Sequence, residues 1–269
     1  APYLERLEEI PLPNYTEGEL ADKPLFQQPD QRDLCHFVGP HHFDQMTEYE
    51  HRLCRAAYWA MVDLIDHEVG RVLEALQRSD QADNTLVIFT SDHGELLGDH
   101  GLYYKGPYFY EPAVRVPLIV SWPGRIPPGR TGALVELIDL APTLLDVASL
   151  EPRPGMQARS LWPLLTSEQA RDRHRRDVYS EYYHGMRTSA KDGPREMIQP
   201  FATMLRDERY KLVVAHGLEP GEFYDLEADP AETRNLWNNE AAQDVKLRML
   251  KRLTDRMAWM VDPLPGRMS

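Results

Sequence analysis

Cysteine, basic residues and long apolar runs are all scarce in this sequence. Only two of its 269 residues are cysteines, which excludes a disulfide-stapled fold and a C-x-x-C metal knuckle. Its 30 lysines and arginines are outnumbered by 43 aspartates and glutamates, a net charge of −13, so no basic surface is available for nucleic acid. No apolar run approaches the roughly 18–20 residues that span a bilayer. Neither nucleic acid nor a membrane is therefore an expected partner.

The sequence does have the composition of a globular protein whose elements are interrupted by proline. Hydrophobic residues make up 42% and charged residues 27% of the chain, which suffices for a large core. Its 22 prolines predict long connecting loops. The first ten residues carry alternating charges and no apolar core of a signal peptide, which favours the cytoplasm. A periplasmic or secreted location stays open, because a targeting signal can lie upstream.

The clearest predicted element is a long amphipathic helix. Thr47 and Glu50 form a capping box, and apolar residues then recur at helical spacing as far as about Gln77. Met61 is expected in the core rather than in a ligand site. A brief loop and the apolar run 85–90 follow. A helix followed by a short continuous apolar strand is typical of a buried parallel sheet covered by helices.

Further elements are predicted along the rest of the chain, while residues 1–46 have the pattern of irregular structure. They are a buried strand at 116–121, a helix at 137–150 with Asp139 as its N-cap, a strand at 178–183, a hairpin of 201–205 with 210–214, and a terminal helix at 240–260. The character of the sequence changes beyond about residue 170, and we predict a domain boundary there.

Asp92 and His93 directly follow the run 85–90 and form the first candidate site. Ligands of α/β proteins bind beyond the carboxyl ends of strands, and Gly94 gives the chain the freedom to turn so that two adjacent side chains converge. A carboxylate beside an imidazole suits a divalent cation such as Ca²⁺, Mn²⁺ or Mg²⁺ better than a thiolate-type zinc site. The alternative is a loop with an Asp turn and a surface histidine.

Lys105 and His100 lie in the polar segment that leaves the same strand. A lysine near a bound cation makes sense if both hold one anionic group, such as phosphate or sulfate. The alternative for Lys105 is an ordinary solvated lysine. His100 is a candidate proton donor to a leaving oxygen, although a structural hydrogen bond is the favoured interpretation.

Short segments in a fixed order from about residue 48 to the end resemble the sulfatase family of the alkaline phosphatase superfamily. They are Thr90–Glu95, Leu97–His100, Lys105-Gly106, Tyr110-Glu111, Arg115–Pro117, Ser121–Gly124, Asp139–Leu145, Arg209–Leu212 and Phe223–Leu236. Each piece alone is weak, but their common order is specific.

This resemblance implies one divalent metal ion held partly by Asp92 and His93, with Lys105 contacting the non-bridging oxygens of a substrate ester. Many members of the family carry asparagine at the position of His93. An Asp-His pair is more similar to the branch that contains phosphonate monoester hydrolases and promiscuous arylsulfatases. The preferred ester and the identity of the metal therefore stay open.

The nucleophile that the resemblance implies does not occur in this sequence. In the family it is a cysteine in Cys-x-Pro/Ala-x-Arg, matured to formylglycine, and neither Cys35 nor Cys54 has these neighbours. The family's N-terminal acidic metal ligands are also missing, and residues 1–3 resemble a segment just downstream of a substrate-binding histidine. We therefore expect this chain to be the second half of a sulfatase-like enzyme, inactive alone and partnered by its N-terminal half. Half a sheet leaves apolar surface exposed.

The expected fold class is α/β: the second half of an alkaline-phosphatase-like sandwich with a mostly parallel sheet over residues 1–170. A small α+β subdomain with an antiparallel sheet follows over residues 171–269. The expected function is metal-dependent hydrolysis of a small-molecule sulfate ester. The alternatives are a phosphonate monoester or phosphodiester hydrolase, or, for a complete natural chain, a non-catalytic pseudo-enzyme or assembly module. The oligomeric state, a homo-oligomer included, stays open.

Overall fold

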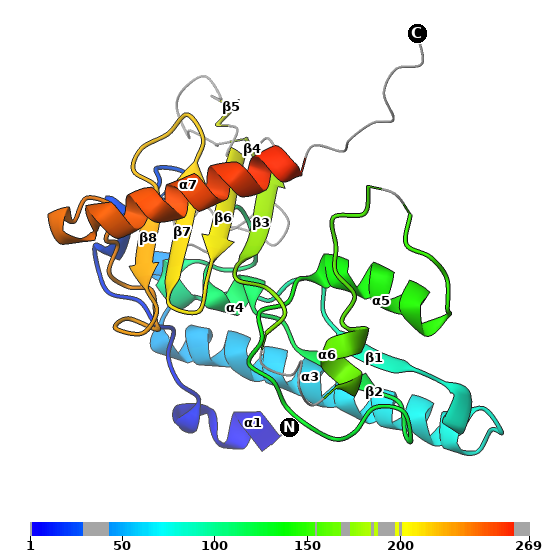
Figure 1. The fold of residues 1–269 in the computed structure, drawn as a ribbon. Coiled ribbons are helices and arrows are strands. Elements are labelled where there is room, and N and C mark those ends of the chain that lie inside the picture. The colour runs from blue at the N-terminus through cyan, green and yellow to red at the C-terminus, as the bar shows by residue number, and fades with distance from the viewer. Residues whose placement is uncertain are drawn as a thin grey trace, which may run out of the picture. The chain divides into compact units, whose positions relative to one another are not determined.

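The computed structural model describes residues 2–28, 43–153, 155–167, 173–183, 186–187, 197–198 and 201–260. It divides into two compact units, one of Ala1–Trp122 with His184–Pro200 and one of Pro123–Tyr183 with Phe201–Ser269 (Figure 1). These units do not follow the predicted boundary at about residue 170, and whether the family's domains divide there stays a prediction. No helix among the described residues combines the length and apolar character needed to cross a bilayer.

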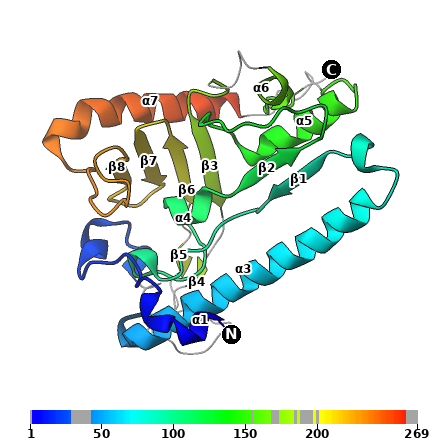
Figure 2. The same ribbon diagram turned by 90° about the horizontal axis from the view of Figure 1, so that it is seen from below.

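The first unit is built around the predicted long helix, α3 (Glu48–Gln77). Its capping box is formed, since the Thr47 side chain accepts from the amide of Glu50 while the Glu50 carboxylate accepts from the amide of Thr47. The short helices α1 (Pro2–Glu5) and η1 (Leu7–Glu9) pack on the first turns of α3, as Figure 2 shows for α1. Leu7, Ile10 and Ala56 form the small core between them.

Much of the apolar stripe of α3 is exposed. Met61, expected in the core, is 54% exposed, because the described residues of this unit cover only the N-terminal end of the helix. The exposed large aliphatic residues and methionine of α3 are Leu53, Met61, Val62, Leu64, Ile65, Val72 and Leu73. An apolar row this long on one helix is unusual for a solvent-facing surface.

The strands β1 (Val87–Thr90) and β2 (Leu118–Ser121) are both present, but they pair antiparallel and not in parallel as expected. The prediction that both strands are buried is also wrong, because neither contains a buried residue. A parallel pair needs a crossover that returns the chain to the starting edge. Here the connection holds only the single turns η5 (Asp99–Gly101) and α4 (Glu111–Val114), so the chain enters β2 at the end where it left β1. Phe89 and Ile119 are cross-strand partners and both are exposed.

The second unit contains a four-stranded antiparallel sheet in the order β3-β6-β7-β8. Its strands are β3 (Val178–Tyr183), β6 (Phe201–Arg206), β7 (Tyr210–Ala215) and β8 (Glu222–Asp225). The predicted strand, hairpin and antiparallel subdomain are thus confirmed. The terminal helix, η8 (Glu240–Ala242) followed by α7 (Gln243–Trp259), lies across this sheet (Figure 1). Leu205, Leu212, Phe223, Met249 and Leu253 form the buried core between helix and sheet.

Two further pieces complete the description of the elements. The loop expected at 186–200 contains a two-residue pair, β4 (Met186–Arg187) with β5 (Met197–Ile198), and its remaining positions lie outside the described residues. The predicted helix at 137–150 is present as η6 (Leu137–Asp139) and α5 (Leu140–Val147). The short helix α6 (Trp162–Thr166) belongs to the second unit as well.

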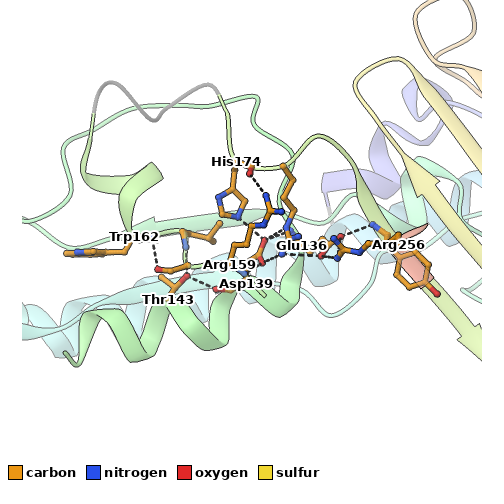
Figure 3. Close-up of polar contacts among 11 residues, drawn as sticks. Glu136, Asp139, Thr143, Arg159, Trp162, His174 and Arg256 are labelled. Carbon is orange, nitrogen blue, oxygen red and sulfur yellow. Dashed lines mark hydrogen bonds and ion pairs between the residues drawn. The ribbon is translucent and has the colours of Figure 1, made fainter. Parts of the chain in front are cut away.

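A buried carboxylate, Asp139, organises the helical part of the second unit (Figure 3). It accepts two hydrogen bonds from Arg175 and one each from the amides of Arg159 and Glu136, and His174 Nε2 lies 3.1 Å from its Oδ2. Burial opposes its ionisation, but the hydrogen bonds from Arg175 and the two amides outweigh burial and lower its pKa. Asp139 occupies the predicted N-cap position, yet its side chain binds these groups and no amide of α5.

Glu136 extends this network to the sheet and to α7. Its carboxylate accepts from the amide of Tyr179 in β3 (2.8 Å) and from Arg256 in α7 (2.8 Å), and it lies 3.4 Å from Arg175. Figure 3 shows this chain of contacts running from α5 to Arg256. The residues on either side of position 170 are therefore joined by buried charged groups, which explains why one compact unit contains both.

Candidate metal and anion site

Asp92 and His93 leave the end of β1 side by side, with side chains 86% and 42% exposed. The Asp92 Oδ2 and His93 Nε2 atoms are 3.6 Å apart. Asp92 Oδ1 accepts the amide of His93 at 3.0 Å, which orients the carboxylate. The structure thus brings the two predicted metal ligands together on an open surface.

The imidazole of His93 is oriented by a backbone carbonyl. Its Nδ1 lies 2.8 Å from the carbonyl oxygen of Gly94; a carbonyl only accepts, so Nδ1 carries the proton. In the neutral tautomer with its proton on Nδ1, the lone pair of His93 Nε2 would face the Asp92 carboxylate. Two such acceptors repel one another unless the imidazole is charged or a cation lies between them. The donor set and its carbonyl support therefore fit a divalent metal ion.

Gly94 is required by a close approach of two backbone segments. Its amide donates to the carbonyl of Ala113 (2.8 Å), and the next amide, of Glu95, donates to that of Pro112 (3.2 Å). A Cβ atom at Gly94 would stand 1.9 Å from the Pro112 oxygen, so no other residue fits without moving α4. The sharp turn that aims Asp92 and His93 is in this way anchored on α4.

Lys105 follows a segment that is hydrogen-bonded to the turn after His93. The amide of Leu96 donates to the carbonyl of Tyr104 (3.1 Å), and the amide of Tyr104 donates to the Glu95 carboxylate (2.5 Å). Lys105 itself is exposed, like Asp92 and His93. The three predicted residues therefore lie on neighbouring, directly bonded segments of one unit.

His100 occupies a different kind of place. Its side chain is 2% exposed, its Nδ1 donates to the Glu19 carboxylate at 2.5 Å, and its ring stacks on Tyr110 with 3.7 Å between centroids. These contacts are those of the structural interpretation, because no face of the ring is open to a leaving group. The amide of His100 also donates to the carbonyl of Asn14 (2.7 Å), so the loop is held by the N-terminal segment.

Cys54 lies in α3 and, of the two cysteines, is the one within the described residues. Partial burial raises the pKa of its thiol, which keeps it protonated and poorly nucleophilic at neutral pH. Cys35 lies outside the described residues. Among the residues that the structure describes, no three histidine, cysteine or acidic side chains are grouped to hold a metal. This part of the chain therefore offers two candidate metal ligands, and its one described cysteine lacks the properties of a nucleophile.

No sequence pattern selected Glu95 or Glu19 as a functional residue, although Glu95 lies inside the motif Thr90–Glu95. The separation of Glu95 from Tyr104 matches neither a helical nor a strand period. Only the folded loop shows that the Glu95 carboxylate accepts the amide of Tyr104. Glu19 lies 81 residues from His100. Its neighbours Lys23 and Gln27 are also buried, on the same segment. The four-residue spacing of Glu19, Lys23 and Gln27 is a local pattern, but the sequence does not show that these side chains are buried.

Comparison with known families supports the assignment of the fold. A family model described as N-sulphoglucosamine sulphohydrolase, C-terminal, matches residues 98–258, more than half of the chain. A model described as Sulfatase matches residues 27–150.

Curated relatives come from bacteria and animals. Choline-sulfatase of Rhizobium meliloti is 33% identical over 216 residues, which are 79% of this chain and 38% of that protein. Arylsulfatase K of Gallus gallus is 35% identical over 71% of this chain and 35% of its own length. A multifunctional alkaline phosphatase superfamily protein of Trinickia caryophylli, PehA, is 35% identical over 73% and 38%. The chain thus spans between a third and two fifths of the length of these relatives.

Solved structures agree. A phosphonate monoester hydrolase from Silicibacter pomeroyi is 28% identical with a TM-score of 0.80, covering 96% of this chain and 52% of that one. A second neighbour, solved with its substrate D-glucosamine-2-N,6-O-disulfate, is 28% identical with a TM-score of 0.69 over 82% and 44%. The chain therefore has the α/β fold of the alkaline phosphatase superfamily. Within that class, the chain belongs to the sulfatase family, whose enzymes generally use a divalent metal ion.

Proposed function

We propose that this chain is the second half of a metal-dependent sulfatase that hydrolyses a small-molecule sulfate ester. Asp92 and His93 supply two of the ligands of its divalent metal ion, Ca²⁺ or Mn²⁺ with Mg²⁺ as a further candidate, and Lys105 binds the ester. The observation that carries the proposal is the contact of Asp92 Oδ2 with His93 Nε2 at the end of β1, with Lys105 on a segment bonded to the same turn.

Each residue has a separate task in this proposal. A bound divalent ion would neutralise charge on the ester oxygens and favour the ionised form of the nucleophile. Asp92 and His93 hold that ion with one oxygen and one nitrogen. Lys105 places its ammonium group where negative charge collects on the transferring sulfuryl group, which stabilises the transition state more than the ground state.

The remaining ligands and the nucleophile are assigned to an N-terminal half. Two ligands from the described residues do not complete a metal site, and Cys54 lies outside the formylglycine motif and has a raised pKa. The chain also spans only 38% of the choline-sulfatase that it matches. These three facts support a formylglycine nucleophile on sequence upstream of residue 1.

The exposed stripe of α3 is the surface on which we place that half. Seven large aliphatic or methionine side chains of α3 are exposed, from Leu53 to Leu73, and so are Phe89 and Ile119 on one face of the β1-β2 ribbon. Monomeric proteins rarely leave contiguous apolar surface of this kind in water. Covering it with the other half of the sheet would bury these side chains and bring the missing ligands to the end of β1.

A phosphonate monoester or phosphodiester hydrolase is the second candidate. It is favoured by the TM-score of 0.80 to a phosphonate monoester hydrolase, across 96% of this chain, and by the Asp-His pair noted above. Sulfate and phosphonate monoesters share a tetrahedral centre and anionic oxygens, so Asp92, His93 and Lys105 would perform the same tasks on either.

The test uses the full-length protein, whose intact mass reports any formylglycine. Hydrolysis of an aryl sulfate and a matched aryl phosphonate is measured with Mn²⁺ or Ca²⁺, for the unaltered protein and for Lys105→Ala. We expect the sulfate to be the better substrate and Lys105→Ala to lower kcat/KM by about 10²-fold or more, as for loss of one oxyanion donor. A preference for the phosphonate selects the second candidate. Unchanged turnover in Lys105→Ala would remove that residue from the site.

A further inference from the structure

Glu95 lies between the proposed metal ligands and Lys105, and one of its carboxylate oxygens bridges two parts of the loop. Glu95 Oε1 accepts from the amide of Leu97 at 3.1 Å and from the amide of Tyr104 at 2.5 Å. Beside it, the amide of Leu96 donates to the carbonyl of Tyr104 at 3.1 Å. Two hydrogen bonds therefore join Tyr104 to residues 95 and 96, and the carboxylate oxygen that accepts one of them also accepts the amide of Leu97.

The two residues whose amides Glu95 holds are both in the left-handed region of backbone conformation. Leu97 has φ 51° and Tyr104 has φ 65°. For residues other than glycine this conformation is strained, and it persists only when the surroundings enforce it. Glu95 provides such enforcement at both strained positions at once.

Lys105 directly follows Tyr104, so the conformation of Tyr104 decides where the chain carries the lysine. A change from left-handed to extended backbone at Tyr104 would redirect the next residue altogether. On the far side, a Cβ atom at Gly106 would stand 2.7 Å from the Tyr108 ring, so that position is closely packed as well. Lys105 is thus an exposed side chain on a backbone that is fixed on both sides.

We propose that Glu95 is a positioning residue that holds the ammonium group of Lys105 against the anionic ester, an inference that rests on the proposed function. Glu95 acts through the backbone of Leu97 and Tyr104 and touches neither the ion nor the substrate. Misplacement of a charge-stabilising group by about 1 Å costs roughly 10²-fold in rate, which sets the size of the expected effect.

The first measurement compares Glu95→Ala with Glu95→Gln in the full-length protein. Alanine removes the acceptor of both amides, and we expect kcat and kcat/KM on the aryl sulfate to fall together by about 10- to 100-fold. Glutamine keeps an amide oxygen in place of Oε1 and should stay within about threefold of the unaltered protein, since a neutral acceptor can still bind both amides. Asp255→Ala, which removes an exposed carboxylate of α7, is the control and should change nothing.

A double-mutant cycle with Lys105→Ala separates positioning from a general loss of structure. If Glu95 acts through Lys105, adding Glu95→Ala to Lys105→Ala should lower kcat/KM by no more than about twofold further. Mn²⁺ affinity, measured by calorimetry with the metal alone, should stay the same in Glu95→Ala. Additive losses in the cycle, lost Mn²⁺ binding in Glu95→Ala, or a Glu95→Gln variant as impaired as Glu95→Ala would each overturn the inference.

Hydrogen exchange keeps this inference distinguishable from the proposed function. An unaltered protein that hydrolyses neither ester refutes the proposed function. In that event the amides of Leu97 and Tyr104 still report on Glu95. Exchange that is accelerated in Glu95→Ala but not in Glu95→Gln supports the two hydrogen bonds by which Glu95 holds this backbone. Unchanged exchange in Glu95→Ala overturns the inference. A Lys105→Ala variant with full activity overturns the positioning role of Glu95, because the ammonium group of Lys105 would then not contribute to catalysis.

Discussion

Replacing Asp139 by alanine should destabilise the second unit by about 3–5 kcal/mol, the usual cost of removing one member of a buried ion pair. The substitution takes away the carboxylate that accepts two hydrogen bonds from Arg175, whose side chain is 2% exposed. Glu136, 3.4 Å away, is already engaged by Arg256 and Tyr179 and compensates only in part. The amide of Arg159 also loses its acceptor.

The assay is urea unfolding at neutral pH, combined with hydrogen exchange of the Arg159 amide, because a chain of two units need not unfold in a single step. Asp139→Asn keeps an oxygen for the amides but loses the charge, so its destabilisation should be intermediate. Asp255→Ala breaks an exposed pair with Lys251 and should cost no more than about 0.5 kcal/mol. A loss below about 1 kcal/mol in Asp139→Ala would refute the view that this network stabilises the unit.

The pH dependence of that difference follows from the direction of the pKa shift. The pKa of Asp139 is lowered in the folded state from an ordinary value of 3.8, so its contribution is complete above the unfolded value and disappears as pH falls through the folded one. The gap between the unaltered protein and Asp139→Ala should therefore be constant between about pH 8 and about pH 5 and close only below the ordinary value. A gap that already closes between about pH 7 and pH 5 would show that ionisation of the Asp139 carboxylate is not the cause of the effect.

Three further predictions test the turn after β1 and the tail. Asp92→Ala should abolish Mn²⁺ binding by the full-length protein, measured by calorimetry, and retained affinity would exclude it as a ligand. Gly94→Ala should distort the turn and lower the melting temperature of the protein. Its control, Gly70→Ala in α3, where a Cβ meets open space, should stabilise the protein by about 0.5–1 kcal/mol. Equal effects of the two substitutions would contradict the close approach of the backbone at Gly94. Lys211→Met removes the cation that faces the buried Glu232 and should lower the free energy of unfolding in urea by about 3–5 kcal/mol. Little change in that free energy would show that the ion pair contributes nothing to stability.

Elements specified by local signals could be predicted from the sequence. The capping box of Thr47 and Glu50 fixed the start of α3, because both partners lie within one turn. The hairpin of β6 and β7 was predicted from two apolar runs around a short polar turn. The strand β3 spans the residues 178–183 that were expected to form it. In each case the period of the sequence and the contacts of the fold involve the same few neighbouring residues.

The direction in which β1 and β2 pair was not predictable in this way. An apolar run predicts a strand but carries no information about its partner, and the antiparallel pairing depends on how the 27-residue connection folds back on itself. The contact of His100 with Glu19 is equally non-local. The pair Asp92 and His93 could be predicted as candidate ligands because adjacent polar residues at a strand end are a local pattern, whereas Glu95 binds the amide of Tyr104, nine residues away.

The tail of the chain explains why a clear family resemblance leaves the substrate undetermined. Lys211 and Glu232, from two separate motifs, form a buried ion pair at 2.6 Å. Asn235 accepts from the amide of Phe223 and donates to the carbonyl of Gly221, each at 3.0 Å, which secures the segment after β8. These residues hold the sheet of the second unit together. Likeness over this region therefore reports a shared subdomain, and the preferred ester has to be decided by residues around Asp92, His93 and Lys105 and by the half that faces them.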